Sequence, residues 1–270
     1  MRTIRLIDGM LAGGLIAFAG ACNETRDTGA VTTEKEGGTS TTPTAEVVEE
    51  RDNALVRVVN AMPGGAASIY AGHSLAFANV AFRAVTDWKE MPDDYFGFKV
   101  VNAGARSDDD ALAENREKLG NGGHYTIIAL PDDDGDADDD GTLRVLDDDL
   151  KPITSGKARV RFVNAISGLD DEIDVYVRGN DNPLVDGVGE GVEAGWNEED
   201  PIKGTLIVRR ENSETALATI PNVDLQAGKS HTYIFTGTPS KVEVIHFMDS
   251  VAMDPDKDDG VPDDRADKRQ

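Results

Sequence analysis

Cysteine and basic residues are both scarce in this chain of 270 residues. Its one cysteine, Cys22, excludes any internal disulfide. Lysine and arginine together number 27 against 51 aspartates and glutamates, so the formal net charge is −24. Because a nucleic-acid backbone requires a basic face, this imbalance excludes nucleic acid as a partner. The acidity instead favours solubility, cations or basic partners.

Long hydrophobic runs are also missing, and the clearest short one lies near the N-terminus. Two arginines precede the apolar residues 10–18, and small residues at 19–21 stand directly before Cys22. A basic start, an apolar run too short to span a bilayer and small closing residues predict a signal peptide over residues 1–21.

The position of Cys22 gives this signal peptide a more specific meaning. Small residues before a cysteine resemble the bacterial lipoprotein signal, which implies that Cys22 is lipidated and anchors the chain to a membrane of the cell envelope. With Asn23 next, the resemblance implies the outer membrane of a Gram-negative cell, facing the periplasm or the cell surface. The alternative is an ordinary secretory signal in which the cysteine has no role.

Two further segments are too polar to form a core. Residues 22–53 are acidic and rich in threonine, which predicts a disordered tether. Residues 251–270 are strongly acidic and predict a disordered tail, in spite of a degraded resemblance of residues 254–265 to a thrombospondin type 3 calcium repeat.

Between these segments the sequence contains a repeat. Residues 54–61 read ALVRVVNA and residues 158–165 read ARVRFVNA. In each copy apolar residues alternate along a strand, while Arg57 and Arg161 fall on the opposite face. We therefore expect one domain over residues 54–150 and a second over residues 157–250.

Each copy predicts about seven short strands separated by turn residues, with no convincing helix. This pattern predicts an all-β fold of two tandem Ig-like antiparallel β-sandwich domains. In residues 119–125 and 225–233 a leucine and a glycine turn precede a tyrosine that enters a strand. We expect Tyr125 and Tyr233 to form the tyrosine corners of the two sandwiches.

The repeat resembles the bacterial domain-of-unknown-function family 4397. The matching features are the Val-Arg-(Val/Phe)-Val-Asn-Ala strand, the Val175–Val177 strand, Asn79–Phe82 and the Gly-then-Tyr closing hairpin. The resemblance implies an Ig-like extracytoplasmic domain, often in tandem on lipoproteins, with no catalytic residue. The second copy departs from it at the glycine-rich residues 187–195.

One acidic stretch has the chemistry of a calcium ligand set. Alternate aspartates in a loop that ends at Gly141 resemble the start of an EF-hand loop, although Asp147 stands where a bidentate glutamate is usual. The candidate calcium ligands are Asp132, Asp134, Asp136, Asp138, Asp140 and Asp147. The alternative is a solvated acidic turn.

Histidines and aromatic residues offer weaker candidates. His231 and His246 could be neighbours across a hairpin, but two histidines make a poor zinc site, and no Gly-x-Ser-x-Gly motif is present. Four aromatic residues could form a carbohydrate- or peptide-binding platform, or could instead be core: Trp88, Trp196, Tyr70 and Tyr176.

Together these features predict a non-catalytic, lipid-anchored protein of the cell envelope. It would act as a spacer or as an interaction or adhesion module toward an unknown envelope protein or glycan. The alternatives are a calcium-dependent binding module that uses residues 132–140 and, more remotely, an unrecognised hydrolase.

Overall fold

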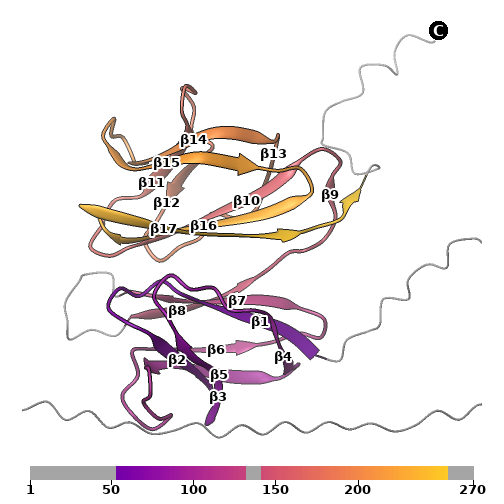
Figure 1. Ribbon diagram of the computed structural model, residues 1–270, viewed down its shortest axis with the longest axis vertical. Coiled ribbons are helices and arrows are strands. Elements are labelled where there is room, and N and C mark those ends of the chain that lie inside the picture. The colour runs from indigo at the N-terminus through magenta and orange to yellow at the C-terminus, as the bar shows by residue number, and fades with distance from the viewer. Residues whose placement is uncertain (1–52, 132–140, 255–270) are drawn as a thin grey trace, which may run out of the picture. The chain divides into compact units, whose positions relative to one another are not determined.

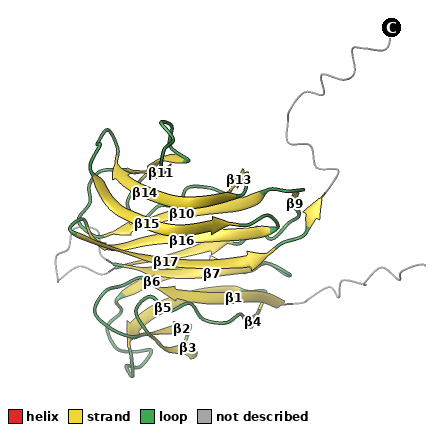
Figure 2. Ribbon diagram, turned by 45° about the horizontal axis from the view of Figure 1, so that its top comes forward, coloured by secondary structure: helices red, strands yellow, loops and turns green. Residues whose placement is uncertain are grey.

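The computed structural model describes residues 53–131 and 141–254, and all its regular elements are strands (Figure 2). Within these ranges no helix is long and apolar enough to cross a membrane. The strands form four four-stranded sheets and one two-stranded sheet. The all-β prediction is confirmed.

The first repeat is a sandwich of two sheets with the strand orders β4-β1-β7-β8 and β3-β2-β5-β6 (Figure 1). Its strands are β1 (Asn53–Asn60), β2 (Ala67–Ala71), β3 (Ser74–Val80), β4 (Lys89–Pro92), β5 (Tyr95–Asn102), β6 (Ala113–Lys118), β7 (His124–Leu130) and β8 (Thr142–Asp147).

The second repeat has the same topology, with the orders β13-β10-β16-β17 and β12-β11-β14-β15. Its strands are β10 (Ala158–Ile166), β11 (Ile173–Val177), β12 (Val185–Val188), β13 (Asn197–Glu199), β14 (Ile202–Arg210), β15 (Ala216–Leu225), β16 (Lys229–Thr238) and β17 (Lys241–Ser250). Identical strand orders in both sheets confirm the internal duplication.

Three details differ from the sequence-based expectation. The first and seventh strands of each repeat pair in parallel, as β1 with β7 and β10 with β16, so neither sandwich is purely antiparallel. Asn53 belongs to β1 and not to the tether. Between the repeats, β9 (Ile153–Thr154) pairs with β18 (Met253–Asp254), so regular structure continues into the segment predicted as tail.

The repeated strand motif buries both of its faces. Val56 and Val58 are fully buried in the core of the first sandwich, and Val160 and Phe162 are fully buried in that of the second. This alternation is the period of two that the sequence predicts. Residues on the opposite face are also buried, because the sheets that carry β1 and β10 cover one another.

The contact between the two sandwiches is an apolar cluster. Two equivalent pairs lie at its centre, Val59 with Ile128 from the first repeat and Val163 with Ile234 from the second, and all four are at most 1% exposed. The Thr236 hydroxyl donates to the Ala61 carbonyl across this contact at 2.6 Å. The short linker and the apolar contact together make the two sandwiches one compact unit.

The tyrosine corner is present in the first repeat. The Tyr125 hydroxyl accepts a hydrogen bond from the Gly120 amide at 2.8 Å. A Cβ on Gly123 would lie 2.6 Å from the Tyr125 ring, so glycine is required beside this corner. The prediction for Tyr125 is therefore confirmed.

In the second repeat the prediction that Tyr233 forms the corner is wrong. The ladder registers place His231 opposite Val160 as they place Tyr125 opposite Val56. His231 Nε2 accepts from the Gln226 amide at 3.1 Å, across the same five-residue separation. A histidine has thus taken over the corner, and Tyr233 lies two residues further along in the core.

The corner histidine makes the second repeat sensitive to acid. Burial, and then His246, lower the pKa of His231 to about 4, and burial also lowers the pKa of His246. The unfolded chain therefore binds more protons between pH 6.5 and about 4, so stability falls as the pH falls through this range.

We expect His231→Gln, which can still accept the Gln226 hydrogen bond but cannot titrate, to lose less unfolding free energy than the wild type between pH 7 and pH 4. Urea unfolding at several pH values measures this difference. Equal losses in the two proteins would contradict the role of His231.

Candidate functional site

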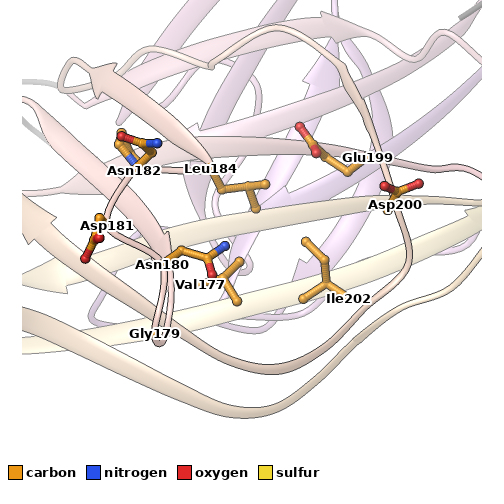
Figure 3. A pocket seen from close by; sticks show the side chains of 10 residues that line it. Val177, Gly179, Asn180, Asp181, Asn182, Leu184, Glu199, Asp200 and Ile202 are labelled. Carbon is orange, nitrogen blue, oxygen red and sulfur yellow. The ribbon is translucent and has the colours of Figure 1, made fainter.

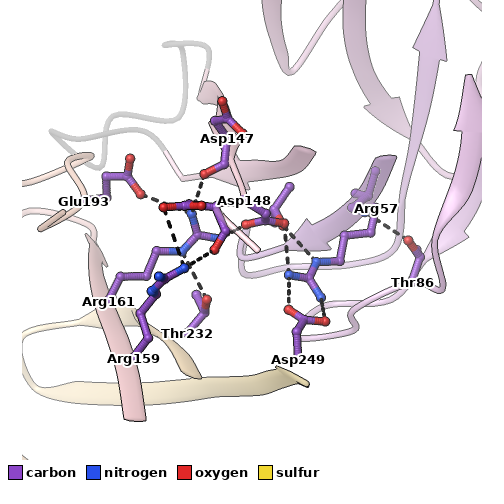
Figure 4. A network of polar contacts seen from close by, with 12 residues as sticks. Arg57, Thr86, Asp147, Asp148, Arg159, Arg161, Glu193, Thr232 and Asp249 are labelled. Carbon is purple, nitrogen blue, oxygen red and sulfur yellow. Dashed lines mark hydrogen bonds and ion pairs between the residues drawn. The ribbon is translucent and has the colours of Figure 1, made fainter. Parts of the chain in front are cut away.

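The most extensive polar network lies between the two repeats and centres on the arginines of the repeated motif (Figure 4). Arg57 is 4% exposed and Arg161 is fully buried. Each guanidinium donates from Nε to the threonine beside it in the parallel strand pair, Arg57 to Thr126 at 2.8 Å and Arg161 to Thr232 at 3.1 Å. The duplication has therefore preserved an Arg–Thr pair in both sandwiches.

Carboxylates from both repeats neutralise these arginines. Asp249 receives two hydrogen bonds from Arg57, at 3.0 and 2.8 Å. Asp148 lies between the two arginines, with one oxygen 3.0 Å from Arg57 Nη2 and the other in contact with Arg161 Nη2. Because its side chain is fully buried, Asp148 is the charge on which both guanidinium groups depend.

A third carboxylate completes the network on the side of the second repeat. Glu193 Oε2 lies 3.4 Å from Arg161 Nη1. Burial raises the pKa of Glu193, while the charge of Arg161 acts in the opposite direction. Arg57 and Arg161 thus face three carboxylates, and the neighbouring Arg159 pairs with Asp149 and Glu198. Every guanidinium of this ion cluster is therefore paired.

Trp88 and Trp196 cover the arginines. The guanidinium carbon of Arg57 lies 4.1 Å from the Trp88 ring centroid, and that of Arg161 lies 4.2 Å from the Trp196 centroid. Both tryptophans therefore belong to the network between the repeats, and neither the platform nor the sandwich-core interpretation describes them. Tyr70 and Tyr176 are half-buried elsewhere, where their hydroxyls donate to the Ala105 carbonyl and to Asp174.

A separate cleft of about 630 Å³ lies in the second repeat (Figure 3). Asn180, Asp181 and Asn182 form one wall, and Glu199 and Asp200 lie across from them. Three apolar side chains lie between the walls: Val177, Leu184 and Ile202. The cleft can receive a small polar ligand.

The two carboxylates of this cleft differ in their surroundings. Asp200 pairs with Lys157 at 3.0 Å. Burial raises the pKa of Glu199, and the charge of Asp200 adds to this effect, while Lys157 opposes it.

A second hollow, the edge groove, lies between β15 and β17 and has a volume of about 370 Å³. Tyr233 and His246 stack on one another there, with ring centroids 4.2 Å apart. The other lining residues are Ile220, Pro221, Asn222, Val223, Asp224, Gln226, Val244 and Met248. The sequence does not predict this groove, although the Pro221–Asn222 pair within a strand pattern is a signal for a bulge.

His231 and His246 are in contact, as the hairpin pattern predicted. Their ring nitrogens Nδ1 and Nε2 lie 3.2 Å apart. In the described parts of the chain, no group of three or more His, Cys, Asp or Glu side chains is placed to hold a metal ion. A hydrogen bond therefore joins the pair, and His246 lines the edge groove.

Most of the predicted calcium ligands, Asp132 to Asp140, lie outside the described residues, as does Cys22. Asp147 is at the far end of β8, opposite Tyr125 in the ladder, about 17 Å of strand from Thr142. Asp147 is thus the one predicted calcium ligand that the structure describes, and its role stays a prediction. A Cβ on Gly141 would lie 2.5 Å from the Leu130 carbonyl oxygen, so the hairpin itself requires the glycine of the motif.

We expect Asp148→Ala to destabilise the protein by roughly 3–5 kcal/mol, because it leaves two buried guanidinium groups short of a counter-charge. Urea unfolding measures the change. The matched control is Asp171→Ala, which removes an exposed partner of Arg210 and should cost at most about 1 kcal/mol. Similar losses in the two variants would contradict the central place of Asp148.

Comparison with known proteins identifies the repeat. No curated protein matches the chain. Among solved structures, the C-terminal domain of AlgF from P. aeruginosa is similar at 21% identity and a TM-score of 0.29, over 35% of this chain and 99% of that one. CBMbc, of family CBM26, from Eubacterium rectale Amy13K, solved with maltoheptaose, has 14% identity and a TM-score of 0.23, over 75% of this chain and 99% of that one.

The family comparison is more specific. Residues 54–176 match the family model described as "Domain of unknown function (DUF4397)". The match includes the whole first repeat, the β10 strand and all of β11 except Val177. The resemblance of the repeat to this family is therefore confirmed.

Proposed function

We propose that this protein is a non-catalytic, lipid-anchored component of the cell envelope, which acts as a spacer and interaction module. Cys22 carries the lipid in this proposal, and the two sandwiches present a binding surface to an envelope protein or a glycan. The resemblance of residues 1–22 to a lipoprotein signal supports the anchor.

The observation that carries the proposal is the buried contact between the repeats. An apolar cluster and a charge network with Asp148 at its centre join the two sandwiches. Two domains joined in this way move as one body, whereas domains joined only by a linker reorient. A rigid body on a membrane anchor is suited to hold a binding surface at a fixed place.

The chemistry of the described residues also favours binding over catalysis. Both ring nitrogens of His231 are engaged, one by the Gln226 amide and the other by His246. The buried carboxylate of Asp148 is held by Arg57 and Arg161. These groups are committed to the fold, so they are poorly placed to transfer protons to a substrate.

Lipidation tests the anchor directly. In a Gram-negative host fed labelled palmitate, we expect the full chain to incorporate label and to fractionate with membranes. Cys22→Ala should lose both properties, because no other thiol is present. Labelling that persists in Cys22→Ala, or its absence from the unaltered chain, would contradict the anchor.

A broad hydrolase screen tests the absence of catalysis. We expect the protein to turn over no ester, glycoside or peptide substrate above background. His246→Ala serves as the matched variant, since His246 lines the edge groove and contacts His231. Turnover that disappears in this variant would overturn the non-catalytic proposal.

A further inference from the structure

We propose that the edge groove between β15 and β17 binds a single neutral glycosyl ring, free or as one unit of a glycan. This inference rests on the proposed interaction function and names its ligand class. Three features of the groove support it. A bulge in β15 opens the groove, its side chains differ from their counterparts in the first repeat, and one of its buried polar atoms has no partner in the described chain.

The groove is open because β15 is bulged. The register of β15 against β14 shifts between the pairs Gly204–Val223 and Leu206–Ile220, where Pro221 and Asn222 lie opposite the single residue Thr205. Asn222 adopts a positive φ of 57°. Bulges of this kind bend an edge strand and are frequent beside binding sites.

The first repeat is closed at the equivalent place. Its β5–β6 ladder runs without a register shift. The Asn115 side chain there donates to the Leu143 carbonyl at 2.7 Å and so links the two edges β6 and β8. The groove is thus a property of the second copy alone.

Side chains have diverged at the same place. The ladder registers match Ile127 and Val145 of the first repeat to Tyr233 and His246 of the second. An aliphatic pair has therefore been replaced by a stacked pair of polar aromatic rings. Inside a sandwich this exchange weakens apolar packing, and it supplies an aromatic face and polar atoms to the groove.

One polar atom of the groove lacks a protein partner. Asp224 Oδ1 is buried and has no partner in the described chain, while its other oxygen lies 3.4 Å from both Lys203 and Gln226. Tyr233, which is 2% exposed, lines the same groove. Buried polar atoms without partners are rare in proteins, and a ligand is one source of the missing partners.

The hydrogen bonds of the histidines fix a donor at the same groove. Because His231 Nε2 accepts from the Gln226 amide, the neutral ring carries its proton on Nδ1 and donates to His246 Nε2. The proton of neutral His246 is then on Nδ1. The groove therefore offers a donor at His246, an acceptor at Asp224 and a hydroxyl at Tyr233 that can do both.

This combination fits a sugar ring. Hydroxyl groups donate and accept at once, so they can satisfy Asp224, His246 and Tyr233 together. The apolar walls at Val244 and Met248 match the C–H face of the ring. Lys203 already neutralises much of the Asp224 charge, so a neutral ligand fits better than a cation.

The 630 Å³ cleft is the natural comparison. None of the buried polar atoms without partners lies on its lining residues within the described chain. Its carboxylate Asp200 is already paired with Lys157. The two hollows can therefore be separated by mutation.

The test is a glycan array probed with the full chain, followed by calorimetry with the cello-, xylo-, malto- or chito-oligosaccharide that scores highest. We expect saturable binding that Asp224→Asn and Tyr233→Phe each weaken roughly tenfold or more. Asp181→Asn, in the other cleft, is the matched control and should bind as the wild type does.

Three results would overturn the assignment: an array without bound sugar, affinity unchanged in both groove variants, or an equal loss in Asp181→Asn. Circular dichroism of each variant shows whether it remains folded. Palmitate labelling and membrane fractionation do not depend on this groove, so failure of the glycan assignment and failure of the proposed anchoring are distinguishable.

Discussion

Burial of the two motif arginines is the constraint on which the arrangement of this protein depends. A guanidinium taken out of water without a counter-charge costs several kcal/mol. Arg57 and Arg161 are nonetheless almost fully buried, because Asp148 serves both and each lies over a tryptophan ring. The carboxylate that makes this burial possible comes from the end of the first repeat, so neither sandwich satisfies its own arginine in full.

The network also shows how far the duplication has become asymmetric. Asp148 and Asp249 occupy equivalent positions in the two repeats. Asp148 follows β8 and lies beside His124, and Asp249 lies beside Ser230, the counterpart of His124. Of the two arginines Asp249 pairs with Arg57, whereas Asp148 pairs with both and Glu193 supplements Arg161. Equivalent residues have therefore acquired different roles, and the two copies are no longer interchangeable.

The sequence predicts the strands well because alternation reports which residues point to the core. It cannot say what covers the other face, so the burial of Arg57 and Arg161 was not predicted. The corner of the second repeat was misassigned because His231 and Tyr233 lie two residues apart, on the same strand face, and either could have entered the turn. The edge groove was missed because it depends on where one bulge falls relative to a neighbouring sheet, which is a tertiary property.

The changes that distinguish the second repeat lie together and work against stability. His231 replaces the corner tyrosine, and Tyr233 and His246 replace an aliphatic pair. Burial lowers the pKa values of both histidines, so acid destabilises the second repeat. The first repeat carries neither exchange. Packing alone does not explain three unfavourable exchanges beside the bulge at Pro221 and Asn222. Substitutions that lower stability are expected where residues are selected for binding.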